Sequence, residues 1–285
     1  MEVADGIDMA KLKGINRIRK FRRTADKLVS KISSLEGISG IALIGGLTRG
    51  FTDKFSDLDV VVFLNEDDDH LKTQVHNARL DEEKRSGIEI DLEMHLVEHF
   101  KAWNWDEIDK REFSRAEIVF DPDGKIKKLF EEKLSVPKDY WIKRVAVFIE
   151  YLTWYGCPPQ ENVGTISESW IERGDLVSAH YCLNYSVELL LKILFALNKE
   201  FLPPPKWIVF DSCELEWLPN DYRKLIKEAT CTKSFTTKDF KRRLNAIRKM
   251  WSQTVPKIEE ETKMTIDQIR KYSFEHDFRL FQYVE

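Results

Sequence analysis

The spacing of hydrophobic residues changes near residue 137 and divides the chain into two parts. Before that point, short apolar segments bounded by turn residues predict strands at residues 38–44, 58–64, 87–97 and 116–120. Helical spacing predicts helices at residues 9–35 and 125–134. The segment 87–97 alternates most clearly, with Ile88, Ile90, Leu92, Met94 and Leu96 on one face and Glu89, Asp91, Glu93 and His95 on the other.

After residue 137, strand-like alternation disappears and long helical patterns follow. They predict helices at residues 139–155, 175–198, 221–230, 237–251 and 259–272, separated by breakers such as Pro158-Pro159 and Pro203-Pro204-Pro205. The predicted fold class is therefore α+β. Residues 1–137 are expected to form a mixed β-sheet flanked by helices, and residues 138–285 an all-α helical bundle.

Composition narrows the class of protein. The 285 residues are 42% hydrophobic and 33% charged, and a net charge of −4 gives no overall attraction to nucleic acid or anionic lipid. The start of the chain lacks the apolar region of a secretory signal, and no apolar run approaches the ~20 residues that span a bilayer. Four scattered cysteines form no metal-binding or disulfide pattern. We expect a soluble, cytoplasmic protein with no membrane partner.

The first predicted helix has a strongly basic face, which is one pattern found in RNA-binding proteins. Its cationic residues are Lys11, Lys13, Arg17, Arg19, Lys20, Arg22, Arg23 and Lys27. Acidic runs at residues 66–69 and 81–83 interrupt any continuous cationic track, and such a face is usually solvated. Nucleic acid is therefore not expected as a partner.

The most informative segment is residues 41–65, IALIGGLTRGFTDKFSDLDVVVFLN. On a strand, Asp57 and Asp59 point to the same face, about 6.5–7 Å apart along the backbone. Carboxylates at the edge of an apolar strand are costly to desolvate unless a positive charge neutralises them. Both can reach one Mg²⁺ ion, or each can help to hold one of two closely spaced ions, because Mg²⁺ prefers carboxylate and phosphate oxygens.

The residues before this pair favour an anionic ligand. Gly45 and Gly46 allow close approach of the backbone to an anion, since no Cβ intrudes. A short helix starting within residues 47–51 would aim free N–H groups at the same anion, and Arg49 would add a mobile positive charge. Phosphates over glycines, with metal beside aspartates, is the arrangement used for nucleotidyl transfer.

A two-metal site needs a further carboxylate, and the third predicted strand offers three on one face. Asp91 lies centrally and would bind a metal or take the proton of the incoming hydroxyl. Glu89 and Glu93 are alternatives, and the sequence barely separates the three. The alternating acidic face is also typical of a solvated sheet edge.

Gly45-Gly46 followed by Ser56-Asp57-Leu58-Asp59 resembles the hG[GS]…[DS]-x-D signature of the polymerase-β-like nucleotidyltransferase superfamily. The longer segment is similar to the minimal nucleotidyltransferase and antibiotic adenylyltransferase branches, and the match covers about the first 135 residues. The resemblance implies that Asp57, Asp59 and Asp91 bind metal. It also implies that Gly45, Gly46, Arg49 and Ser56 bind the triphosphate. Many members have Ser where this chain has Gly46, so one phosphate-binding hydroxyl is missing.

Residues 171–207 resemble, more loosely, the helical domain fused to such transferases in streptomycin- and lincosamide-type resistance enzymes. There the helical half closes over the nucleotide, receives the acceptor and sometimes supplies a catalytic base, which here would be Glu188 or Glu172. The resemblance implies transfer of a nucleoside monophosphate, AMP from ATP, to an acceptor hydroxyl with release of pyrophosphate. The acceptor would be an aminoglycoside- or lincosamide-like molecule or a protein side chain. Such enzymes are monomers or homodimers.

Two alternatives remain open. Arg173 and His180 have the spacing of the HEPN ribonucleases, so the chain could be a toxin–antitoxin-like fusion that AMPylates protein and binds or cuts RNA. The chain could also be a nucleotide-binding regulator with a silent catalytic site.

Overall fold

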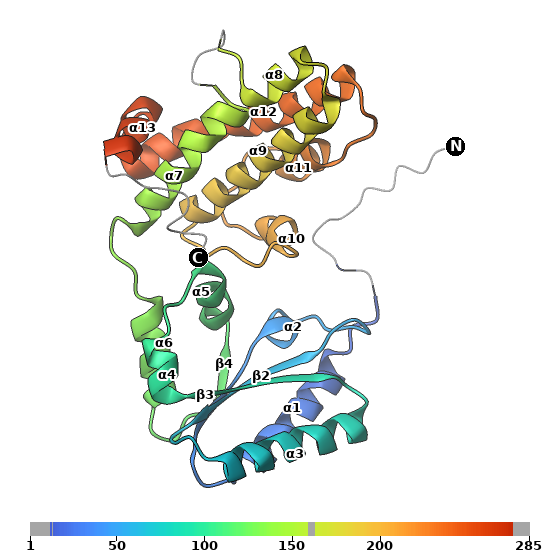
Figure 1. Cartoon of the computed structure of the whole chain (residues 1–285), viewed down its shortest axis with the longest axis vertical. Helices are drawn as coiled ribbons and strands as arrows, with labels where there is room; N and C mark the ends of the chain where they lie inside the picture. The colour runs from blue at the N-terminus through green and yellow to red at the C-terminus, as the bar shows by residue number, and fades with distance from the viewer. Residues whose placement is uncertain (1–11, 13, 159–162, 276–285) are drawn as a thin grey trace. The chain divides into compact units, whose positions relative to one another are not determined.

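The computed structural model describes residues 12, 14–158 and 163–275, which divide into two compact units (Figure 1). One unit extends to Val136, and the other begins at Pro137. The described part of the first unit contains a mixed sheet with helices, whereas the described part of the second contains helices alone. The predicted α+β fold class is therefore confirmed.

The first unit is built on a four-stranded sheet with the strand order β3-β2-β1-β4. Its strands are β1 (Ile38–Leu43), β2 (Leu58–Leu64), β3 (Ile90–Leu96) and β4 (Glu117–Phe120). Strand β1 is antiparallel to β2 and to β4, whereas β2 is parallel to β3. The register of this parallel pair places Asp59 opposite Asp91.

Helices cover both faces of this sheet, because alternate residues of β2 enter two separate cores. Val60 and Val62 pack in a core with α1 (Ile18–Ile32) and α3 (Asp69–Ser86). Val61 and Phe63 enter an aromatic core on the opposite face. That core is closed by α4 (Val97–Ala102), α5 (Glu107–Ser114) and α6 (Lys125–Leu134). The short helix α2 (Gly45–Thr48) directly follows β1.

The prediction for the first helix was wrong at its start. Residues 9–11 and 13 lie outside the described residues, but residues 14–17 are not helical and Ile15 is 81% exposed. Helix α1 begins at Ile18, and its N-cap residue Arg17 makes no side-chain capping bond. The Arg17 N–H donates to the Thr52 carbonyl, and Asn16 Oδ1 accepts from the Thr52 N–H, so hydrogen bonds to a loop replace the preceding helical turn. The apolar spacing at Leu12 and Ile15 therefore does not extend the buried face.

Helix α3 was not predicted, because its sequence is mostly polar. It buries few side chains, among them Leu71 and Val75 against α1 and the sheet. Asp68 caps its start by accepting two backbone N–H groups, and Gly87 ends it in the left-handed conformation, with a φ of 63°. Caps and a narrow apolar contact define this helix, rather than an amphipathic pattern.

The second unit is organised around α9 (Leu176–Leu197), which is buried over most of its length. Helices α7 (Tyr140–Tyr155), α8 (Ile166–Glu172) and α12 (Thr237–Thr262) pack against it. The remaining helices are α10 (Ile208–Ser212), α11 (Tyr222–Thr230) and α13 (Ile266–Glu275). None of the helices in the described ranges combines the length and the apolar character needed to cross a membrane.

The predicted break between residues 251 and 259 was also wrong. Helix α12 continues through Pro256 to Thr262, and α13 starts only at Ile266. Met250, Thr254, Ile258 and Thr262 recur at helical spacing and are all buried. Burial of this continuous stripe outweighs the cost of a proline inside a helix, which is about 3 kcal/mol.

Candidate active site

The two aspartates of the motif lie at the beginning of β2. Leu58 between them is fully buried, and its N–H donates to the Glu89 carbonyl at 2.9 Å. Since successive strand residues point to opposite faces, burial of Leu58 and Val60 on one side sends Asp57 and Asp59 to the other. Asp91 arrives from β3 through the parallel register. One carboxylate oxygen from each of the three aspartates lies within 4.8 Å of the others, which makes them a candidate metal-binding group.

Gly45 is fixed by its contact with Asp59. Its φ of +68° is unfavourable for other residues, and a Cβ there would lie 1.8 Å from Asp59 Oδ2. The N–H of Gly46 donates to the Asp59 carboxylate. The predicted short helix is present, but it starts at Gly45 rather than within residues 47–51. The glycine pair therefore lies against Asp59.

The electrostatics of the group are unfavourable without a cation. Burial, together with repulsion from Asp57, Glu112 and Asp91, raises the pKa of Asp59 from 3.8 to about 6, although the Gly46 N–H acts in the opposite direction. Carboxylates that repel one another through a partly desolvated space are the donor set that a divalent cation neutralises. The residues present thus fit a Mg²⁺ site by their chemistry and by their close approach.

Arg49 is anchored rather than mobile, which corrects the sequence expectation. Its Nη2 donates to Glu112 Oε1 of α5 at 3.1 Å, and both side chains are largely buried. Glu112 thereby joins the site, close enough to Asp59 to raise its pKa. Sequence reasoning missed Glu112 because no local pattern marks it, and only the packing of α5 brings it to the aspartates.

Ser56 lies in the turn that leads into β2. Its hydroxyl donates to Asp53 Oδ1 at 3.2 Å and accepts from the Asp53 N–H at 3.0 Å. The Phe55 N–H also donates to Asp53 Oδ1, at 2.8 Å. These bonds fix the turn, so the hydroxyl has a structural role beside the phosphate contact implied by the resemblance.

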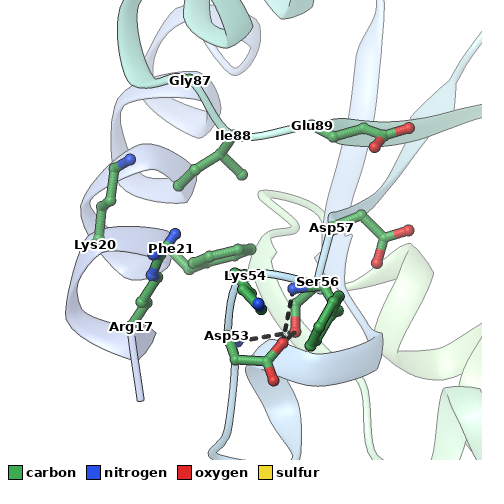
Figure 2. Close-up of a pocket in the computed structure, with 11 residues that line it drawn as sticks. Arg17, Lys20, Phe21, Asp53, Lys54, Ser56, Asp57, Gly87, Ile88 and Glu89 are labelled. Carbon is green, nitrogen blue, oxygen red and sulfur yellow. Dashed lines mark hydrogen bonds between the residues drawn. The ribbon is translucent and has the colours of Figure 1, made fainter. Parts of the chain in front are cut away.

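A pocket of about 310 Å³ opens next to Asp57 and Glu89 (Figure 2). Its wall includes Arg17 and Lys20 from the start of α1 and Lys54 from the turn before β2. Sequence analysis assigned the basic face of this helix to solvent. The helix packs on the sheet with its N-terminal end beside the motif. This packing, which the sequence does not reveal, brings Arg17 and Lys20 to the wall of the pocket.

The three acidic residues expected on β3 have different surroundings. Asp91 belongs to the carboxylate group, whereas Glu89, just before the strand, borders the pocket. Glu93 Oε2 lies 2.8 Å from Nε2 of His95, which lowers the pKa of Glu93. The structure therefore separates residues that the sequence left as alternatives for the third carboxylate.

The predicted residues of the helical half belong to the second unit. Glu188 forms an ion pair of 2.7 Å with Lys192, one turn further along α9. Glu172 is exposed at the end of α8, and Arg173 stacks on Trp170.

His180 is buried and accepts a hydrogen bond of 2.8 Å at Nδ1 from Arg243. Burial and this arginine lower the pKa of His180. The structure therefore places His180 in a buried network with Arg243, and the exposed Arg173 has other partners.

Two family models match this chain, and the second of them crosses the boundary between the two units. A family model described as a nucleotidyltransferase domain matches residues 25–135, and one described as a domain of unknown function, DUF4037, matches residues 105–208. Among solved structures, the chain is similar to a nucleotidyltransferase-like protein from Exiguobacterium sibiricum 255-15. That similarity has 10% identity and a TM-score of 0.42, and it covers 84% of this chain and 77% of the other. The search of curated proteins gave no significant match. Residues 25–135, which carry the glycine pair and the three aspartates, belong to the nucleotidyltransferase domain family.

Proposed function

We propose that this chain is a Mg²⁺-dependent nucleotidyltransferase that transfers AMP from ATP to a hydroxyl group of an acceptor and releases pyrophosphate. One observation carries the proposal. Asp57, Asp59 and Asp91 converge within 4.8 Å beside the glycine pair, inside a nucleotidyltransferase domain. Their mutual repulsion is the condition that bound divalent metal relieves.

In this proposal each residue at the motif has a separate role. Asp57, Asp59 and Asp91 hold the metal, and a two-metal site is expected from the number of carboxylates. Bound Mg²⁺ supplies neutralisation of the phosphate oxygens and lowers the pKa of the acceptor hydroxyl. Gly45 and Gly46 leave room for the triphosphate, while Arg49 and Ser56 contribute a cation and a hydroxyl to it.

The transfer is written as one displacement at the α-phosphorus. The acceptor oxygen forms a bond to this phosphorus, and the bond from the phosphorus to the oxygen that bridges it to the β-phosphorus breaks. Pyrophosphate leaves with that electron pair. The hydroxyl proton passes to a carboxylate, for which Asp91 and Glu188 are the candidates.

The acceptor is proposed to be a small molecule with a free hydroxyl, of the aminoglycoside or lincosamide kind, or a protein side chain. The helical unit would receive it and would supply Glu188 as a base. If so, Glu188→Gln should lower kcat by about a hundredfold while leaving ATP affinity unchanged. An unchanged kcat would remove Glu188 from the catalytic residues.

The direct test is labelled ATP with Mg²⁺ and a panel of hydroxyl acceptors, with product detected as the AMP adduct and as pyrophosphate. Asp57→Asn should abolish transfer and metal-dependent ATP binding, whereas Asp81→Asn, the same change on the exposed surface of α3, should preserve both. ATP binding without turnover on any acceptor would favour the silent regulator instead.

A further inference from the structure

We propose that the pocket beside Asp57 binds the terminal phosphates of the nucleoside triphosphate and holds the departing pyrophosphate through Arg17, Lys20 and Lys54. This inference rests on the proposed function and adds to it a binding site for the leaving group. Arg17 and Lys20 lie outside the sequence motif, and Lys54 lies in the turn between its two halves.

Hydrogen bonds join the main chain at Arg17 to the loop before the motif aspartates. The Arg17 N–H donates to the Thr52 carbonyl at 2.7 Å, and the Asn16 side chain donates to the Gly50 carbonyl at 3.0 Å. The N–H of Thr52 donates back to Asn16 Oδ1 at 3.3 Å. The start of α1 and the loop that leads to Asp57 are thus joined as one piece, so Arg17 cannot move away from the motif without breaking these bonds.

The pocket has two ends of different charge. Arg17, just before α1, and Lys20 on α1 lie on one side of it, and Asp57 and Glu89 lie on the opposite side (Figure 2). Asp53 also lines it, but its carboxylate accepts from the Phe55 N–H and from the Ser56 hydroxyl. Within the described residues, the charged groups of Arg17 and Lys20 have no hydrogen-bond or ion-pair partner. The N-terminal end of α1 adds partial positive charge on the same side.

A metal-bound polyphosphate matches this distribution of charge. Oxygens near the reacting phosphorus would lie at the aspartate end, where metal neutralises the carboxylates. The terminal phosphates would then reach the cationic end. The volume of about 310 Å³ is at the lower limit of small-ligand pockets and suits a phosphate group rather than a large acceptor.

The same residues would contribute to the chemical step. As the bond to the α-phosphorus breaks, negative charge grows on the pyrophosphate. Cations already placed around it stabilise that charge more than they stabilise the intact nucleotide. Arg17 can also donate two parallel hydrogen bonds to one phosphate, which fixes its orientation.

The test is calorimetric titration of the full-length protein in Mg²⁺ with pyrophosphate, with α,β-methylene ATP and with AMP. The double variant Arg17→Ala/Lys20→Ala should weaken binding of pyrophosphate and of the ATP analogue by about tenfold or more, and leave AMP binding unchanged. Lys54→Ala should show a smaller loss. The control Arg19→Ala/Arg23→Ala removes the same charge from exposed positions of α1 that do not line the pocket.

Three outcomes would overturn the proposal. An equal loss of pyrophosphate binding in the control Arg19→Ala/Arg23→Ala would show that only the total positive charge of the protein matters. Normal binding of pyrophosphate and of the analogue, with a raised KM for a phosphorylated acceptor, would assign the pocket to the acceptor and leave the proposed function intact. Wild-type protein that binds neither ligand in Mg²⁺ would instead refute the proposed function itself.

Discussion

Two polar clusters in this protein, one around Arg243 and one around Asp59, differ in whether the fold provides partners for their charged groups. In the helical unit, the fully buried guanidinium of Arg243 donates to the Ala229 carbonyl, to Thr232 Oγ1, to His180 Nδ1 and to Asn184 Oδ1. In the first unit, Asp57, Asp59 and Asp91 lie close together, and burial together with repulsion from the neighbouring carboxylates raises the pKa of Asp59. The first cluster provides acceptors for its buried donors, whereas the second leaves like charges facing one another.

The difference separates a structural cluster from a candidate functional one. Arg243 joins α12 to α9 and to the end of α11, and two of its acceptors, the Ala229 carbonyl and His180 Nδ1, would be left buried without it. Ionised Asp59, by contrast, makes folding less favourable, and a bound cation would relieve this cost. Uncompensated charge therefore points to a ligand more clearly than burial alone does.

The largest effect is expected from removal of one charge of the aspartate group. Asp57→Asn should lower transfer activity by about a thousandfold or more, because metal binding and charge neutralisation depend on this carboxylate. Circular dichroism and thermal melting should show an intact fold. Near-normal transfer by this variant would contradict the metal assignment.

The next largest effect is expected in the helical unit. Arg243→Met should lower the free energy of unfolding by about 3 kcal/mol, since the Ala229 carbonyl and the His180 imidazole nitrogen would remain buried without a donor. Chemical denaturation measures the change. The matched control is Arg173→Met, where the arginine is exposed and a loss below about 1 kcal/mol is expected.

Replacement of Asp59 tests the contrast between the two clusters, because it should lower activity and raise stability. Asp59→Asn should raise the free energy of unfolding of the metal-free protein at pH 7 by about 1–2 kcal/mol, since it removes a repelled carboxylate but keeps an oxygen for the Gly46 N–H. The folded-state pKa of about 6 lies above the ordinary 3.8, so the folded wild type binds the proton more tightly.

The raised pKa of Asp59 makes the stability of the wild type depend on pH. The stability that the wild type gains by protonating Asp59 is fully present below about pH 4 and is lost as the pH rises through 6. Denaturation of both proteins in EDTA at several pH values should therefore show their difference shrinking as the pH falls from 7 to 4. A constant difference would disprove the raised pKa of Asp59.

The smallest effect is expected at an exposed ion pair of α6. Lys128→Ala breaks the pair with Glu132 and should change the free energy of unfolding by less than about 0.5 kcal/mol, because exposed pairs one helical turn apart contribute little. A loss comparable to that of Arg243→Met in chemical denaturation would show that the pair has a structural role that its exposure does not indicate.

The sequence predicted the elements whose pattern is strong. Strand β2 and helix α6 have the predicted bounds, and the alternation within residues 87–97 matches β3. Helix α3 was missed because caps and a few contacts define it. The predicted start of α1 and the predicted break between residues 251 and 259 were wrong, since hydrogen bonds to a loop in one case and a buried stripe in the other override local spacing.

By itself, the sequence determined what depends on neighbouring residues along the chain. Asp57 and Asp59 share a face because strand residues alternate, and the glycine pair precedes them in the order that the family requires. Tertiary structure alone decided that Asp91 joins this group, because the parallel register of β2 and β3 sets which acidic residue stands opposite Asp59. It also brought Glu112 and Arg17 to the site, through the packing of α5 and α1. Pattern fixes the face on which a residue lies, whereas register and packing, which depend on distant contacts, fix its neighbours.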